Sequence, residues 1–323
     1  MKITMGIVLF GLGLVIANPE LWAQKYPTRE IEMVIGWSPG GGTDVIARIF
    51  ASELQNVLKV PVTPINKAGA SSTIAGEYVR KAAKDGYTIF AGSLGWTLGC
   101  ATLADVPHQP LRDFTPIAKV ASVPQCIFVK SESPYKTLED FVDRAKKNPK
   151  SLSCGIPGAG SDAHLNVAVF RKAAGIDFNF VPFKGSADTV PAILGGHTDA
   201  GCGSLPVAIP FAAAKKVRIL AITGNHRVKQ FPDVPTFREK GYNETFFVNW
   251  TGVWVANGVP QNVMDILRSA CEKAMQSKDY ISKIEGQGGV VEQTTLEEYR
   301  KTVDQEMKVA EAIAKEIGLT TKK

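Results

Sequence analysis

The chain has 323 residues, of which 45% are hydrophobic and 21% charged, with 30 Gly and 19 Pro. This composition is typical of one large or two average globular domains, and it excludes disordered, collagen-like and coiled-coil proteins. The 37 Lys and Arg exceed the 31 Asp and Glu, for a net charge of +6, but no block of like charges is present. We therefore expect no nucleic-acid partner.

The N-terminal residues have the pattern of a secretory signal. Lys2 precedes an apolar run over residues 3–17, which is too short to span a bilayer comfortably, and the small residue Ala23 suits a cleavage site. We expect residues 1–23 to be removed on export. Because no Cys precedes Cys100, nothing near the cleavage site could carry a lipid, and we expect an unanchored periplasmic protein. The alternative is a signal anchor that stays attached.

Segments with strand and helix patterns alternate along the rest of the chain. Helix 44–58 shows one apolar stripe, and capping boxes open two more helices, at Thr137 with Asp140 and at Thr295 with Glu298. The last helix should end before Gly318. The alternation predicts an α/β fold with largely parallel strands. Strands are expected over residues 31–36, 60–65, 87–92, 126–130, 152–156, 178–183, 217–223 and 246–256.

The cysteines do not have the spacing of a disulfide framework. They are five in number, widely separated and mostly in apolar surroundings. A chain of this size buries enough surface to need no disulfides. We expect buried side chains that behave as small hydrophobes at Cys100, Cys126, Cys154, Cys202 and Cys271.

Two strand-to-helix turns are rich in glycine. The first covers residues 37–44, Trp-Ser-Pro-Gly-Gly-Gly-Thr-Asp, and the second residues 157–165, Pro-Gly-Ala-Gly-Ser-Asp-Ala-His-Leu. Glycines let a ligand approach the backbone, and the start of a helix offers free N–H groups and a positive dipole end. One such turn is more often structural than functional. Two of them suggest one anion held between two lobes.

Nucleotide and metal sites fit these residues poorly. A P-loop requires Gly-Lys followed by Ser or Thr, which neither turn contains, and a dinucleotide fingerprint requires glycine where Ala163 stands. A carboxylate is the better candidate ligand. No second ligand lies at metal spacing from any histidine, so we expect neither a metal nor a cofactor. The histidines are His108, His164, His197 and His226.

Ser93 is the only candidate nucleophile. Residues 91–95 differ by one position from the nucleophile elbow of α/β hydrolases and follow a predicted strand. However, residues 96–100 are a poor helix start, and no acid and histidine follow in triad order. We expect no enzyme, with a secreted hydrolase using Ser93 as the least favoured alternative. His164 is more in keeping with a helix-start residue that donates a hydrogen bond than with a general base.

With these residues in view, the chain resembles the substrate-binding receptors of tripartite tricarboxylate transporters, the Bug or TctC-like family of bacterial periplasmic proteins. The resemblance covers nearly all of the chain after the signal. Departures are Lys67, Phe183 and Gly203, the last at a position where an acidic residue is frequent. The resemblance to this family is carried by eight motifs: residues 26–29, 39–44 with Arg48, 66–70, 85–88, 158–160 with 164–165, 181–186, 232–236 and 250–252.

The resemblance implies a type II periplasmic-binding-protein fold, in which two α/β lobes joined by two crossing strands close on a ligand cleft. We place the crossings near residues 123–129 and 247–256. Lobe one is then 24–125 plus 249–323, and lobe two is 126–248. The resemblance also implies a small carboxylate, a dicarboxylate or an amino or aromatic acid as ligand, and the membrane permease subunits of a tripartite tricarboxylate-type transporter as partners. We expect a monomer.

The site residues of the family carry over position by position. The lobe-one wall would offer backbone N–H groups and the Thr43 hydroxyl as donors. Its residues are Pro39, Gly40, Gly42, Thr43 and Asp44. The lobe-two wall would comprise Gly158, Ala159, Gly160, Ser161, Ala163 and His164. Candidates for the far end of the pocket are Ser93, Trp96, Phe183, Lys184, Gly185 and Ser204.

The expected ligand is a carboxylic acid without an amino group. Trp37, Trp96 and Phe183 could wall an aromatic acid, and Gly203 leaves no evident partner for a ligand ammonium. We therefore favour a dicarboxylate or an aromatic acid over an amino acid. The alternatives are a receptor for an inorganic oxyanion and a sensor that signals to a membrane kinase.

Overall fold

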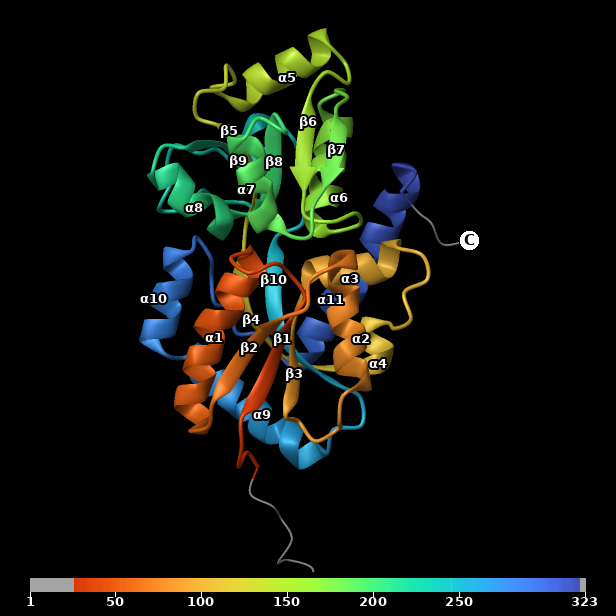
Figure 1. The fold of residues 1–323 in the computed structure, drawn as a ribbon, viewed down its shortest axis with the longest axis vertical. Coiled ribbons are helices and arrows are strands. Elements are labelled where there is room, and N and C mark those ends of the chain that lie inside the picture. Colours follow the sequence, from red (N-terminus) through yellow and green to blue (C-terminus); the bar gives the residue numbers. More distant parts are fainter. Residues whose placement is uncertain (1–25, 245, 320–323) are drawn as a thin grey trace, which may run out of the picture.

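The computed structural model describes residues 26–244 and 246–319, so the expected signal, residues 1–23, lies outside the described residues. The chain forms two halves, each built around one five-stranded sheet and stacked along the long axis of the molecule (Figure 1). This is the two-lobed α/β architecture that we expected. Within the described ranges, no helix is long and apolar enough to cross a membrane.

Lobe one is the half with strand order β2-β1-β3-β10-β4. Its strands are β1 (Ile31–Ile35), β2 (Val62–Asn66), β3 (Thr88–Ser93), β4 (Phe114–Val123) and β10 (Asn249–Ala256). Its helices are α1 (Gly42–Leu58), η2 (Ala70–Ser72), α2 (Thr73–Lys81), α3 (Leu94–Thr102), α4 (Pro110–Asp113), α9 (Gln261–Met275), α10 (Lys278–Gly286) and α11 (Leu296–Glu316). One core joins the sheet to α1, α9 and α10, and another joins it to α2, α3 and α11.

Lobe two is the half with strand order β7-β6-β8-β5-β9. Its strands are β5 (Gln125–Lys130), β6 (Ser153–Ile156), β7 (Asn179–Pro182), β8 (Ala200–Ser204) and β9 (Val217–Ile222). Its helices are α5 (Leu138–Lys147), α6 (Asp162–Ala173), α7 (Ser186–Leu194), α8 (Leu205–Ala213) and η3 (Arg238–Lys240). Helices α5 and α6 share one core with the sheet, and α7 and α8 share another.

The sheets are mixed and not largely parallel, which corrects our expectation. Strand β1 pairs in parallel with β2 and β3, and β6 with β7 and β8, but β10 and β5 are antiparallel to their neighbours. The reason is topological: β10 enters lobe one from lobe two, and β5 enters lobe two from lobe one. Each therefore begins at the boundary where the parallel strands end. The turns after β1, β3, β6 and β8 consequently meet at that boundary.

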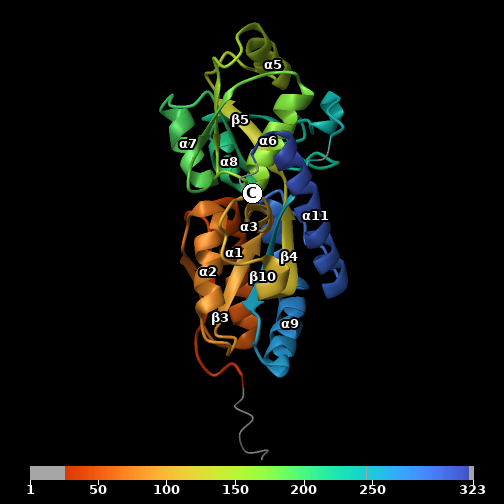
Figure 2. The ribbon, with the colours of Figure 1, turned by 90° about the vertical axis from the view of Figure 1, so that its right-hand side faces the viewer.

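The chain crosses between the lobes twice. Only Pro124 separates β4 from β5, and the chain returns between Ile222 and Asn249. A third connection is not covalent: helix α11 of lobe one runs up beside α6 of lobe two, where Lys172 pairs with Glu316 (Figure 2). The division of the chain at residues 126–248 stays our proposal for lobe two.

The predictions that rest on one short sequence motif are confirmed. Both capping boxes are present, with Thr137 accepting from the Asp140 N–H and Thr295 from the Glu298 N–H. Helix α11 ends before Gly318. All five cysteines are buried, as predicted, and none of them forms a disulfide.

Strands β4 and β8 were not predicted. Strand β8 reads Ala-Gly-Cys-Gly-Ser, a composition with low strand propensity. Its glycines are required by packing, because a Cβ on Gly201 would lie 2.4 Å from the Ile193 side chain, and one on Gly203 2.8 Å from that of Ser186. Helix α7 thus packs closely against this strand, and tertiary contact overrides propensity here.

Candidate ligand-binding cleft

Asp44 holds the lobe-one turn together. Its carboxylate accepts a hydrogen bond from the Gly40 N–H at 2.8 Å, pairs with Arg48 Nε at 2.9 and 3.0 Å, and accepts from Asn66 Nδ2 at 2.7 Å. Gly40 has a φ of 77°, which favours glycine. The Asp44 side chain is only 3% exposed. Both Asp44 and the Gly40 N–H are thus occupied within the protein, which corrects their expected role as ligand contacts.

His164 plays the matching part in the lobe-two turn. Its Nδ1 accepts from the Gly160 N–H at 3.1 Å, and Ser161 caps α6 by accepting from the His164 N–H at 3.2 Å. Burial, with a smaller contribution from Arg171, lowers the pKa of His164 to about 4. The imidazole is therefore neutral at pH 7 and accepts at Nδ1, whereas the sequence predicted a donor.

The two lobes are closed on each other. The Ser38 hydroxyl of lobe one donates to Asp188 of lobe two at 2.8 Å, and the Ser71 hydroxyl donates to the Ala159 carbonyl at 2.6 Å. A Cβ added to Gly42 would lie 2.2 Å from Cβ of Ser204 across the boundary. A side chain at position 42 would therefore clash with Ser204 when the lobes are closed, so only glycine fits there.

A small cavity of about 10 Å³, which has room for about one water molecule, lies between the closed lobes, and we call it the inner cavity. Its lobe-one wall is the start of α1, where the first N–H groups lack intrahelical partners. Its other walls come from the first crossing, the turns before α6 and α7, the start of α8 and the start of β10. The lining residues are Trp37, Gly41, Gly42, Thr43, Gln125, Pro157, Asp162, Ser186, Ser204 and Asn249.

A larger and less polar groove opens beside it, between η2 of lobe one and α7 of lobe two, and we call it the outer groove. Phe183 is half-buried in this groove, and the Lys184 side chain is exposed. The lining residues are Gly69, Ala70, Ser71, Leu103, Gly158, Ala159, Pro182, Phe183, Lys184, Asp188, Pro191, Ala192 and His197.

The predicted site residues divide into three groups. Trp37, Gly42, Thr43 and Ser204 line the inner cavity. Gly158, Ala159, Phe183 and Lys184 line the outer groove. The others line neither: Pro39 and Gly40 are exposed, Asp44, Ser161, Ala163 and His164 are buried within the turns, and Gly160 and Gly185 lie against Thr102 and Ser38 across the boundary.

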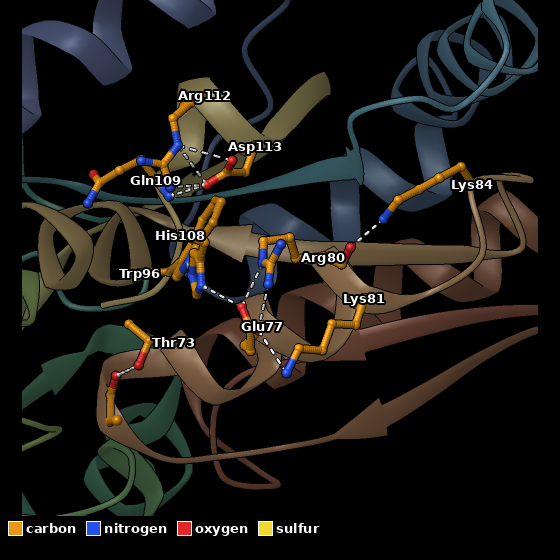
Figure 3. Close-up of polar contacts among 11 residues, drawn as sticks. Thr73, Glu77, Arg80, Lys81, Lys84, Trp96, His108, Gln109, Arg112 and Asp113 are labelled. Atoms are coloured by element: carbon orange, nitrogen blue, oxygen red, sulfur yellow. Dashed lines mark hydrogen bonds and ion pairs between the residues drawn. The ribbon is translucent and has the colours of Figure 1, made fainter. Parts of the chain in front are cut away.

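Trp96 belongs to the core of lobe one and not to the far end of the pocket. It is fully buried against Phe90, Phe114 and Trp254. Its indole N–H donates to His108 Nε2 at 3.1 Å, which is visible in Figure 3. Nδ1 of the same imidazole lies 3.6 Å from the carboxylate of Glu77, so the tryptophan is fixed by a network behind the site.

Ser93 is also fully buried, and its hydroxyl accepts from Trp37 Nε1 at 2.9 Å. Helix α3 follows it directly over Leu94–Thr102, so our expectation of a poor helix start was wrong. The helix forms because every one of its residues is buried, which outweighs the weak propensity of its glycines. In this structure Ser93 positions the indole of Trp37, which lines the inner cavity.

Six lining residues of the inner cavity were not predicted as site residues: Gly41, Gln125, Pro157, Asp162, Ser186 and Asn249. Asp162 is 3% exposed, and its carboxylate accepts from Asn249 Nδ2 at 2.7 Å, from Gln125 Nε2 and from the N–H groups of Asp162 and Ala163. Desolvation raises the pKa of Asp162 despite these donors. Gln125 and Asn249 begin the two crossing strands, so the expected hinge was the available signal for them.

The described part of the chain contains no group of three or more His, Cys, Asp or Glu that could hold a metal. The arrangement is a closed cavity with helix N–H groups and hydroxyls on one side and a carboxylate with two amides on the other. It is the site of a two-lobed solute-binding protein.

The comparisons with known proteins agree with this class. Residues 46–319 match the family described as "Tripartite tricarboxylate transporter family receptor" (TctC), and the chain belongs to that family. Its members are binding proteins and not enzymes. Protein BugT of Bordetella pertussis is 29% identical, and the alignment covers 100% of both chains.

Solved structures are similar over most of the chain. A Rhodopseudomonas palustris protein solved with adipate is 28% identical, with a TM-score of 0.87 over 91% of this chain and 98% of that one. MatC from the same organism, solved with bound malate, is 28% identical, with a TM-score of 0.83 over 89% of this chain and 99% of that one.

Proposed function

We propose that this receptor captures a small carboxylate between its lobes in the periplasm and delivers it to the permease subunits of a tripartite tricarboxylate-type transporter. The observation that carries the proposal is the inner cavity, which faces the start of α1 and is enclosed by residues of both lobes. Such a site suits a carboxylate because it supplies neutral, pre-oriented donors and a positive dipole end.

The lining supports a carboxylate without an arginine clamp. Thr43, Ser186 and Ser204 add three hydroxyls to the N–H groups of α1, and no Lys or Arg is among the residues that line the inner cavity. Hydrogen bonds to a charged acceptor are each worth roughly 1.5 to 3 kcal/mol net. A few of them offset the cost of association and lobe closure.

Adipate and malate are the ligands of two structural neighbours, and they are the first acids to test here. Isothermal titration with dicarboxylates and aromatic acids should give saturable binding to the signal-free protein. Sulfate and phosphate serve as the contrast, because a small enclosed site could also suit an inorganic oxyanion. Binding of sulfate with no response to any organic acid would refute the carboxylate proposal.

A single added methyl group at Gly42 should block closure of the two lobes. Gly42→Ala places a methyl group against Ser204 across the boundary, so we expect at least about tenfold weaker binding with little change in the stability of the open form. Gly286→Ala is the matched control, because a Cβ there meets nothing within 4 Å in α10. Equal affinities of the two variants would show that the ligand binds without this closure.

Delivery to a permease is tested in cells. A strain that lacks this receptor should lose uptake of the acid identified by titration, and plasmid-borne receptor should restore that uptake. Unchanged uptake with a lost transcriptional response to the acid would favour the sensor role instead.

A further inference from the structure

We propose that residues 70–72, which we call the left-handed segment, set how readily the two lobes part: Ser71 holds the lobes together, and backbone strain at Ser72 opposes it. The segment coincides with η2, and Ala70 and Ser71 line the outer groove between the lobes. This inference goes beyond the proposed function, because it concerns the opening of the lobes and not the identity of the ligand.

The backbone of the left-handed segment is strained. Among the described residues, this is the one place where three consecutive non-glycine residues have a positive φ, which is 45° at Ala70, 49° at Ser71 and 70° at Ser72. Left-handed backbone brings Cβ close to the following carbonyl oxygen, so residues with a side chain keep it only where their surroundings impose it. Three such residues in a row therefore indicate a conformation that packing enforces.

The side chain of Ser72 does not compensate for this strain. Ser72 stands at the N-cap of α2, where a serine usually caps the helix, but its hydroxyl makes no cap bond. The residue is 1% exposed, and the hydroxyl has no hydrogen-bond partner among the described residues. A Cβ on Gly36, just after β1, would lie 1.6 Å from this hydroxyl oxygen. Ser72 is thus held in place by close packing, and its unpaired hydroxyl adds to the cost.

Contacts from both lobes impose the left-handed backbone. Within lobe one, the Thr73 hydroxyl donates to the Ala70 carbonyl at 2.7 Å (Figure 3). From lobe two, the Ala159 carbonyl accepts the hydrogen bond of the Ser71 hydroxyl at 2.6 Å. Gly158 approaches so closely that a Cβ there would lie 2.8 Å from Ser71 Oγ. The second glycine-rich turn therefore forms one wall around Ser71.

Opening of the lobes removes that wall. The hydrogen bond from Ser71 and the contact with Gly158 are lost together, and the left-handed segment keeps only its contacts within lobe one. The strain is therefore imposed by the closed form and relaxes in the open form. A contribution that differs between two forms shifts their equilibrium, so the Ser71 bond favours closure and the strain at Ser72 favours opening. A receptor must open again to release its ligand, and strain of this kind promotes that step.

The test measures the closed population of the ligand-free, signal-free protein. Ser38→Cys and Asp188→Cys are combined in one background, because these two side chains meet across the boundary at 2.8 Å in the closed form. Copper phenanthroline at a fixed concentration oxidises the two thiols to a disulfide, and the rate of this trapping reports the closed fraction. The five native cysteines are buried and therefore compete little.

Two neighbouring substitutions should act in opposite directions in this background. Ser71→Ala keeps the strained backbone and removes the bond across the boundary, so we expect trapping to be about fivefold slower. Ser72→Gly removes the strain and the unpaired hydroxyl, so we expect trapping to be about fivefold faster.

Lys59→Gly is the matched control. Lys59 is exposed at the end of α1 and has a φ of 61°, so glycine relieves the same kind of strain away from the boundary. This variant should unfold at a higher urea concentration with an unchanged trapping rate. Equal trapping rates in Ser72→Gly and Lys59→Gly, or an unchanged rate in Ser71→Ala, would overturn the inference. So would a complete lack of trapping in all four proteins, because the closed contact would then not form. Titration with acids tests the proposed function separately, so the two proposals can fail independently.

Discussion

The two glycine-rich turns have the same backbone arrangement but are held by different side chains. In each, the N–H of a glycine is held by a side chain four residues later: Gly40 by the carboxylate of Asp44, and Gly160 by the imidazole of His164. Each turn also carries one acid near its helix start. Asp44 is ion-paired with Arg48, whereas Asp162 has no cationic partner among the described residues.

This difference separates an acid with a charged partner from one without. Asp44 has all its oxygens committed within lobe one, so it stabilises the turn and leaves the start of α1 free for an anion. Asp162 is held only by neutral donors and lines the inner cavity. Two acids with similar sequence contexts therefore have different partners, one charged and one neutral.

The largest expected effect concerns pH and the neutral imidazole of the lobe-two turn. An unfolded histidine takes up a proton below about pH 6.5, whereas folded His164 does so only near pH 4. The folded state is therefore favoured above pH 6.5, and the free energy of unfolding should fall by about 3 kcal/mol between pH 6.5 and 4 through this group.

Replacing the imidazole should flatten that dependence. Urea unfolding of His164→Asn from pH 7 to 4 checks it, with His226→Asn, at an exposed position, as control. The control should keep the steeper loss of the parent. If His164→Asn loses stability with pH as steeply as the control does, the imidazole is not what holds the Gly160 N–H.

The next effect compares the two acids directly. Asp44→Asn weakens the ion pair with Arg48 and the bonds to Gly40 and Asn66, so we expect the free energy of unfolding to fall by about 2 kcal/mol. Asp162→Asn removes a buried, unpaired charge, and because burial raises the pKa of Asp162, the ligand-free protein should be equally stable or more stable near neutral pH.

Thermal unfolding of the two ligand-free variants measures this comparison. A loss of stability in Asp162→Asn as large as that in Asp44→Asn would place both acids in the same structural class.

The smallest effect concerns the caps of the two helices. Ser161 caps α6 through its hydroxyl, whereas α1 begins at Gly41 without a side-chain cap. Ser161→Ala should lower the free energy of unfolding by about 1 kcal/mol. Chemical denaturation at neutral pH measures it, and no change would mean that the lobe-two turn, like the lobe-one turn, is held mainly by the side chain that binds its glycine.

Much of the site was visible in the sequence because its turns are local. The glycine-rich segments, the helices that follow them and the capping boxes depend on residues a few positions apart. Such patterns predicted that two helix starts face an anion site, and Gly42 and Thr43 belong to the first of these turns; Ser204 was carried over from the family resemblance. The family motifs extended this to the two-lobed fold.

Several of the errors concern contacts between residues distant in sequence. Trp96 follows a predicted pocket turn, but its indole is buried in the core, where it hydrogen-bonds to His108 and packs against Phe114. The Asp44 carboxylate accepts a hydrogen bond from Asn66 within lobe one and does not line the cleft. Asp162 was not predicted as a site residue, although it lies in the second glycine-rich turn. Its neighbours Gln125 and Asn249 lie far from it along the chain.

The sequence by itself determined the class of protein and the position of its two glycine-rich turns, because both are encoded in short motifs that act locally. Only the tertiary structure decided which residues of those turns reach the cavity. The reason is that the two crossing strands bring Gln125 and Asn249 to Asp162, and a buried charge is defined by its spatial partners.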